Sequence, residues 1–275
     1  MVASFRVSFM GGFFKFLGRG TLSFLSYLGQ LADLVREMVV AACCGMPRLN
    51  LTGRQIVAVG FGSQTVVIVT GAFTGAVFAA QSYFKFSDLG LATGVGPVVS
   101  IAMCRELGPV LTGLMVAGRV GASMAAEIGT MKVTEQIDAL RSMGVHPVDY
   151  LVMPRAIGTM ISMPLLVAES IGFGLLASHV IVVYFFGVPS AWYDDQVVAN
   201  TELEDISIGM IKGFAFGWLI VLISCNQGLR AKNGAVGVGQ ATTNAVVQSS
   251  LAILITNLFL SFILNYFFPL GSGNY

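Results

Sequence analysis

The fold is decided by one stretch that carries no charge, IVAVGFGSQTVVIVTGAFTGAVFAAQSYF, residues 56–84. Arg54 and Lys85 lie on either side of it, and no acidic or basic residue lies between them. About 20 mostly apolar residues in helical conformation cross the hydrocarbon core of a bilayer. This stretch therefore predicts a transmembrane helix.

Further apolar stretches predict more membrane spans. The second stretch is interrupted by the Arg105–Glu106 pair and by Pro97 and Pro109, which predicts a broken or re-entrant start followed by a helix. We therefore expect an all-α membrane protein with about five transmembrane helices in one domain, residues 51–275. The expected spans are 56–84, 89–128, 156–186, 206–227 and 242–268.

The composition of the 275-residue chain supports this fold class. Hydrophobic residues make up 55% and charged residues 11%, and the mean hydropathy is +0.81. A soluble domain has about 25% charged residues, so the composition excludes an ordinary soluble enzyme. The net charge of +1 excludes the strong positive field of a nucleic-acid-binding protein. Two His and four Cys in no ligand spacing lead us to expect no metal site.

The N-terminal region, residues 1–50, has a different pattern, in which phenylalanines alternate with basic residues. This pattern predicts an amphipathic helix lying in the membrane interface, although a basic tail beside the membrane would have the same composition. The charges interrupt any long apolar run, so we expect no cleaved signal peptide. The residues are Phe5, Phe9, Phe13, Phe16 and Phe24, with Arg6, Lys15 and Arg19 among them.

The distribution of Lys and Arg predicts the orientation. With the N-terminus in the cytoplasm, eleven basic residues lie inside, and Lys85 and Lys212 lie at the outer edges of spans. With five spans the C-terminus is then periplasmic. The inside residues are Arg6, Lys15, Arg19, Arg36, Arg48, Arg54, Lys132, Arg141, Arg155, Arg230 and Lys232.

Charged residues within the spans are candidates for function or for ion pairing, because charge at membrane depth is costly. Arg105 and Glu106 stand beside a Gly-Pro breaker, and we interpret Glu106 as functional. Arg119, Glu127 and Glu169 are interpreted as structural ion-pair residues. The chain has no GxxxxGK[ST] motif, so we expect neither nucleotide binding nor enzymatic activity from it.

Two helical patterns indicate contact surfaces. Small residues recur every fourth position at Gly113, Ala117, Gly121, Ala125 and Gly129, which predicts close helix packing either within the chain or with a second copy. In the following inner loop, a short amphipathic helix is predicted near residues 133–141. Its polar face carries Glu135, Asp138 and Arg141, and it suits contact with a separate cytoplasmic ATPase.

These motifs resemble those of the MlaE/YrbE family, the permease subunits of MCE-type lipid ABC transporters. The resemblance rests on RELGPVLTGLMVAGRVGASMAAEIGTM (residues 105–131), TEQIDAL (134–140), MPR (153–155) and ATTNAVVQSS (241–250). It covers about residues 51–268.

The resemblance implies a homodimeric, multi-pass permease of the bacterial inner membrane. It implies an N-terminal interfacial helix, a coupling helix at residues 134–140 and phospholipid as substrate. Its partners would be a cytoplasmic ABC ATPase, which binds ATP and Mg, and a periplasmic MCE-domain protein. Arg105 and Glu106 would lie near the lipid cavity. One alternative from the residues alone is an ion-coupled secondary transporter of an amphipathic substrate, because membrane carboxylates also build such sites. Another is a non-transporting membrane scaffold that anchors a soluble partner through the inner loop.

Overall fold

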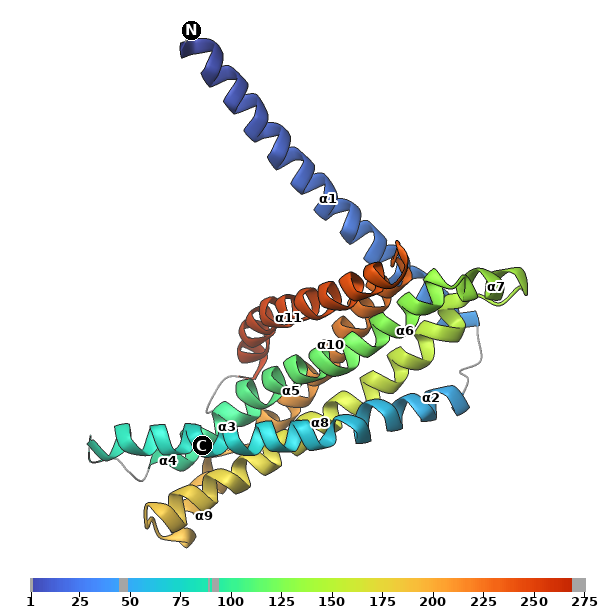
Figure 1. Ribbon diagram of the computed structural model, residues 1–275. Helices are drawn as coiled ribbons and strands as arrows, with labels where there is room; N and C mark the ends of the chain where they lie inside the picture. The colour runs from blue at the N-terminus through green and yellow to red at the C-terminus, as the bar shows by residue number, and fades with distance from the viewer. Residues whose placement is uncertain (1, 45–48, 89, 91–93, 269–275) are drawn as a thin grey trace.

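The computed structural model describes residues 2–44, 49–88, 90 and 94–268, and it consists of helices that pack into a bundle (Figure 1). Among the described residues, five helical stretches are long and apolar enough to cross a membrane, which confirms the predicted all-α membrane fold. They run over Leu49–Asp88, Val95–Val133, Val148–Phe185, Leu203–Leu229 and Gly234–Phe267.

Several of these spans contain short π-helical segments. The first span comprises α2 (Leu49–Ile56), η1 (Val57–Phe61) and α3 (Gly62–Asp88). The second comprises α4 (Val95–Ala102), η3 (Met103–Leu107), α5 (Gly108–Val116), η4 (Ala117–Gly121) and α6 (Ala122–Val133). The third comprises η5 (Val148–Val152), α8 (Met153–Val180) and η6 (Ile181–Phe185). The last two are α10 (Leu203–Leu229) and α11 (Gly234–Phe267).

The second span corrects the expectation of a broken or re-entrant start, because its helical conformation is continuous from residue 95 to residue 133. Pro97 lies in the first turn of α4, where a missing N–H group removes no helical hydrogen bond. Pro109 is the second residue of α5, just after η3, and the wider π-helical turn accommodates it. Residues 89 and 91–93 of the predicted range lie outside the described residues.

Two short helices mark the ends of the bundle. Helix α7 (Gln136–Ser142) lies between the second and third spans, and α9 (Ser190–Asn200) lies between the third and fourth. They are at opposite ends of the bundle in Figure 1. We call these ends the α7 end and the α9 end.

Helix α1 (Val2–Cys44) is long and extends away from the bundle (Figure 1). Its last turns pack on the bundle through Leu34, Met38 and Ala41, which are 6%, 2% and 9% exposed. Most side chains of the Phe-rich segment, including every Phe and basic residue named for the interfacial helix, lie outside the described side chains. The interfacial placement of this helix therefore stays a prediction.

Glycines set the closest helix contacts in the bundle. A Cβ atom added at Gly71 of α3 would lie 2.6 Å from the carbonyl oxygen of Ser170 in α8, and one added at Gly75 would collide with the backbone of Gly174. The backbones of α3 and α8 therefore touch, as small residues allow in membrane helices.

Candidate functional site

The ladder of small residues packs within the chain. A Cβ at Gly113 would meet Phe216 and Ile253, and a Cβ at Gly121 would lie 2.9 Å from Ser224 Oγ. Gly129 faces Ala231 and Val238, and Ala117 and Ala125 are completely buried. The ladder face of the second span is thus covered by α10, α11 and the short turn between them, so this face is occupied within one copy of the chain.

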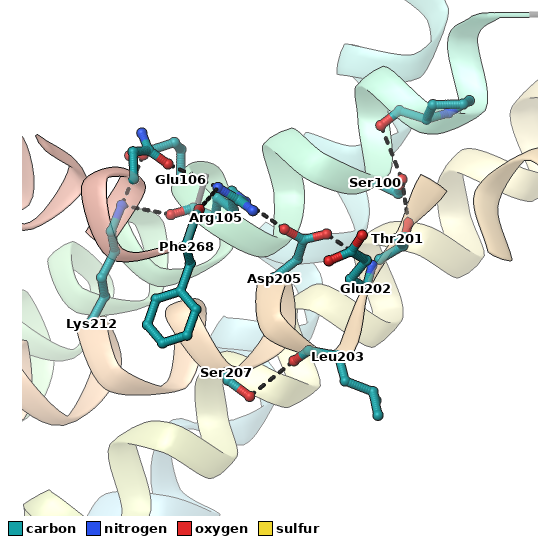
Figure 2. Close-up of polar contacts among 12 residues, drawn as sticks. Ser100, Arg105, Glu106, Thr201, Glu202, Leu203, Asp205, Ser207, Lys212 and Phe268 are labelled. Carbon is teal, nitrogen blue, oxygen red and sulfur yellow. Dashed lines mark hydrogen bonds and ion pairs between the residues drawn. The ribbon is translucent and has the colours of Figure 1, made fainter. Parts of the chain in front are cut away.

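A polar network at the α9 end contains both residues of the Arg105–Glu106 pair (Figure 2). Arg105 forms an ion pair with Asp205 of α10, and the two side chains are 7% and 3% exposed. The Arg105 guanidinium also donates to Asn265 Oδ1 at 2.8 Å and to the Phe268 carbonyl at 3.2 Å. Arg105 is therefore held inside the protein by three partners.

Asp205 also takes part in capping the N-terminus of α10. Its second carboxylate oxygen accepts a hydrogen bond from the backbone N–H of Glu202 at 3.0 Å, and the Glu202 side chain reciprocates in a capping box. A carboxylate at this position interacts favourably with the N-terminal end of the helix dipole. The same side chain thus anchors the start of one span and neutralises a cation of another.

Glu106 pairs with Lys212, which the sequence places at an outer span edge but which is completely buried. Lys212 Nζ lies 2.8 Å from Glu106 Oε1 and 2.8 Å from Ser261 Oγ of α11. Asn257 of α11 donates to the other Glu106 oxygen at 2.9 Å. Two cations and two carboxylates are therefore balanced at the junction of η3, α10 and α11.

The network leaves Glu106 as its accessible charged member. The Glu106 side chain is 42% exposed, whereas Lys212 is not exposed at all. Apolar side chains of α11 lie exposed on the same helix as Asn257, among them Leu254, Leu258 and Phe262. The site can present a carboxylate and an amide beside an apolar wall, and Arg105 holds the wall and the network in place.

Sequence reasoning missed Asp205, Lys212, Asn257, Ser261 and Asn265 as members of this network. A signal for three of them exists, because residues 257, 261 and 265 are polar at four-residue spacing in an otherwise apolar span. This spacing puts them on one helix face.

The other membrane-depth charges are separated from each other. Arg119 donates to Ser63 Oγ at 2.8 Å, and Glu169 accepts from Gln64 at 3.0 Å. Glu127 forms an ion pair with Arg155 at 2.9 Å and accepts from Ser123 at 3.0 Å. Each of these contacts except Ser123–Glu127 joins two different spans.

At the α7 end, the polar side chains of the predicted coupling helix are exposed to solvent. Ile137 is buried, and Glu135, Asp138 and Arg141 are exposed. Asp138 lies between Lys132, at 3.0 Å, and Arg141, at 3.7 Å. Glu135 precedes α7 in the left-handed conformation with φ of 60°.

Two neighbouring pockets lie at the α7 end and were not foreseen from the sequence. One of about 370 Å³ is bounded by α7 and the loop after it, and one of about 520 Å³ lies between α1 and η5. Glu37 and His146 line both. Among the described residues, no group of three His, Cys, Asp or Glu side chains is placed to hold a metal ion.

Comparisons with known proteins agree with this architecture. Residues 52–263 match the family described as Permease MlaE. A probable ABC transporter permease protein of Rickettsia typhi is 43% identical over 88% of this chain and 93% of its own length. A protein with the same description from Synechocystis is 41% identical over 78% of this chain and 81% of its own length.

A plant relative extends the comparison. The Arabidopsis thaliana protein named trigalactosyldiacylglycerol 1, chloroplastic, is 38% identical over 86% of this chain and 67% of its own length. The match to the family spans most of the five-helix bundle, including the Arg105–Glu106 network and α7. The chain therefore belongs to the MlaE family of transporter permeases.

Proposed function

We propose that this permease moves phospholipid or a related lipid as the membrane subunit of an ABC transporter. One observation carries the lipid assignment: Glu106 and Asn257 form an accessible polar group beside the exposed apolar side chains of α11. An apolar wall suits acyl chains and the polar group suits a headgroup. The Arabidopsis relative is named after a diacylglycerol lipid, and this name supports the same substrate class.

The proposed assembly contains two copies of the chain. Their α11 faces would enclose the lipid cavity, with Glu106 at its polar end. The position of Arg105 modifies the expectation from the sequence, because its guanidinium is satisfied by Asp205, Asn265 and the Phe268 carbonyl. Its role in this proposal is to position the Glu106 segment.

Energy would come from a cytoplasmic ABC ATPase that binds ATP and Mg and docks on the polar face of α7. The exposed Glu135, Asp138 and Arg141 support this role, because a charged face at the end of a membrane bundle suits a soluble partner. Closure of the ATPase would shift the permease between two conformations. Lipid would pass to or from a periplasmic MCE-domain protein at the α9 end.

The proposed location is the bacterial inner membrane, with the N-terminus in the cytoplasm and the C-terminus in the periplasm. The excess of Lys and Arg in the loops at the α7 end supports this orientation.

A pull-down of the tagged chain in mild detergent tests the proposal, with proteins and bound lipids identified by mass spectrometry. We expect an ATPase with a Walker motif, an MCE-domain protein and phospholipid to be recovered with the chain. Recovery of the chain without an ATPase would overturn the ABC mechanism and favour an ion-coupled transporter. Recovery of the complex without lipid would overturn the substrate.

A further inference from the structure

A polar pocket distinct from the Glu106 network lies beside Arg119 of the second span. It has a volume of about 220 Å³ and lies between the first span and the second. Its polar lining residues are Gln55, Arg119, Ser123 and Glu127. Fourteen residues separate Arg119 from Arg105, which corresponds to about 21 Å along a helix.

Arg119 differs from the other cations deep in the spans. Arg105 is paired with Asp205, Lys212 with Glu106, and Arg155 with Glu127. In residues 49–88 and 94–268, no carboxylate lies within ion-pair distance of Arg119, which donates to the Ser63 hydroxyl at 2.8 Å. A guanidinium has five N–H donors. A charge at this depth calls for an anionic partner.

The backbone around Arg119 makes room for this side chain and for a ligand. A Cβ atom at Gly62 would lie 2.8 and 2.9 Å from the two terminal guanidinium nitrogens. The neighbouring Gly118 has open space around it, with no atom within 4 Å of an added Cβ. Arg119 is the third residue of η4, just as Arg105 is the third residue of η3, and π-helical turns are frequent at functional sites.

The charge balance of the pocket defines the ligand. Glu127 lies two turns from Arg119 but is neutralised by Arg155 at 2.9 Å. Arg119 therefore leaves one uncompensated positive charge, which suits a singly charged anion. The Gln55 amide adds a donor that suits phosphate oxygens, and the Ser123 hydroxyl beside it donates to Glu127 at 3.0 Å.

The surface beside the pocket is apolar. Val57 and Phe61 of η1 are 62% and 77% exposed and flank Ala58 and Val59, which line the pocket. We propose that this pocket binds the phosphodiester of a phospholipid, with Arg119 as its cation and the acyl chains along η1. The inference rests on the proposed lipid transport, and it adds a second headgroup site on the cytoplasmic half of the route.

Lipid binding to the full-length chain tests this proposal. The chain is purified in an uncharged detergent, freed of lipid, and titrated with dioleoylphosphatidylglycerol, with dioleoylglycerol, which lacks the phosphate, and with inorganic phosphate. Bound ligand is measured by native mass spectrometry. The variants are Arg119→Gln, Arg119→Lys and Gly62→Ala, and Arg54→Gln is the control, because Arg54 is an exposed arginine near the same end that does not line the pocket.

We expect Arg119→Gln to weaken phosphatidylglycerol binding about tenfold, as the loss of a charge-assisted hydrogen bond predicts, and Arg119→Lys to weaken it less. Gly62→Ala should also weaken it, because the added methyl group crowds the guanidinium. Arg54→Gln and the binding of dioleoylglycerol should be unchanged. Thermal unfolding verifies that each variant is folded, and Gly62→Ala decides the question if Arg119→Gln does not fold.

Three results would overturn the inference. Unchanged phosphatidylglycerol binding in folded Arg119→Gln means that the pocket binds no lipid phosphate. Displacement of the lipid by inorganic phosphate assigns the pocket to free phosphate instead. Dissociation of a dimer by Arg119→Gln with unchanged lipid binding assigns Arg119 to a contact with the second copy. Failure of the wild-type chain to bind any phospholipid would instead overturn the proposed function itself.

Discussion

The ammonium group of Lys212 supplies a hydrogen bond that Pro109 cannot. Lys212 Nζ lies 2.7 Å from the carbonyl oxygen of Arg105, and an α-helix would satisfy this oxygen with the N–H of residue 109. Because Pro109 has no N–H, the span depends here on a side chain from α10. The same ammonium neutralises Glu106 at 2.8 Å. A single lysine thus satisfies a backbone carbonyl of the second span and neutralises the carboxylate of Glu106.

We expect Lys212→Met to destabilise the protein by about 3 kcal/mol, at the lower end for a broken buried pair because Glu106 is half-exposed. Unfolding in detergent with increasing dodecyl sulfate measures this change. Lys212→Met combined with Glu106→Gln removes both charges and should be more stable than the single variant. Equal stability of the single and double variants would contradict the pairing.

The two members of the capping box at the start of α10 should differ in their effect on stability. Glu202→Ala removes one capping interaction and is expected to cost about 1 kcal/mol. Asp205→Ala removes the reciprocal interaction and also leaves the Arg105 guanidinium unpaired, which is expected to cost about 3–5 kcal/mol. The same unfolding titration compares them, and equal losses would show that the Arg105–Asp205 contact contributes nothing.

The ladder of small residues predicts a steric effect that depends on helix face. Gly121→Leu should destabilise the protein by about 1–3 kcal/mol or more, because a Cβ at Gly121 already lies 2.9 Å from Ser224 Oγ. Gly118→Leu is the matched control, three residues away in the same π-helical segment with open space around it. If both variants unfold alike, close packing of this face against α10 is not the cause.

The polar face of α7 predicts a loss of partner binding without a loss of stability. Glu135→Lys reverses an exposed charge at a position with φ of 60°, which Lys tolerates no worse than Glu. We expect the ATPase recovered with the chain to fall about tenfold, as for reversal of a contact at a charged interface. Glu204→Lys makes the same change at the exposed α9 end and should leave ATPase recovery unchanged. Wild-type recovery with Glu135→Lys would exclude this face as the docking site.

Tyr193 of α9 predicts a dependence of stability on pH. Burial raises the pKa of Tyr193 above its ordinary value of 10.0, and the neighbouring Asp194 raises it further, whereas the hydrogen bond with Ser178, at 2.9 Å, acts in the opposite direction. The unfolded chain therefore releases the tyrosine proton at a lower pH than the folded chain, and stability falls as the pH rises above 10. Unfolding at pH 9 and pH 11 should show a smaller loss for Tyr193→Phe than for the wild type.

The spans could be predicted from the sequence because hydropathy alone defines them. Each predicted span overlaps one of the five helical stretches, and α7 lies within two residues of the predicted segment 134–140. The charges and prolines around Arg105 and Pro109 predict an interruption, whereas the helix is continuous there. A widened helical turn and a lysine from another span satisfy the backbone there, and neither is visible in a hydropathy pattern.

The partners of the candidate residues could not be predicted, because they depend on how the helices are rotated against one another. Asp205 lies 100 residues after Arg105, and Asn265 lies 160 residues after it. The eight-residue spacing of Arg119 and Glu127 places them on one helix face. Arg119 nevertheless contacts Ser63 of the first span, and Glu127 contacts Arg155 of the third. The three-dimensional packing of the helices sets these pairings, and a single sequence does not specify it.

The backbone contact between Gly75 and Gly174 limits how the permease can move. With no side chain between α3 and α8, neither helix can slide or turn past the other without a collision of main-chain atoms. We therefore expect the two helices to move as one rigid body during transport. The displacement in the proposed lipid transport would then occur at the contacts of α11, whose buried side is formed mainly by the small residues Gly237, Ala241, Ala245 and Ser249. Because α11 packs on the second and fourth spans, we expect it to move relative to them while the first and third spans stay together.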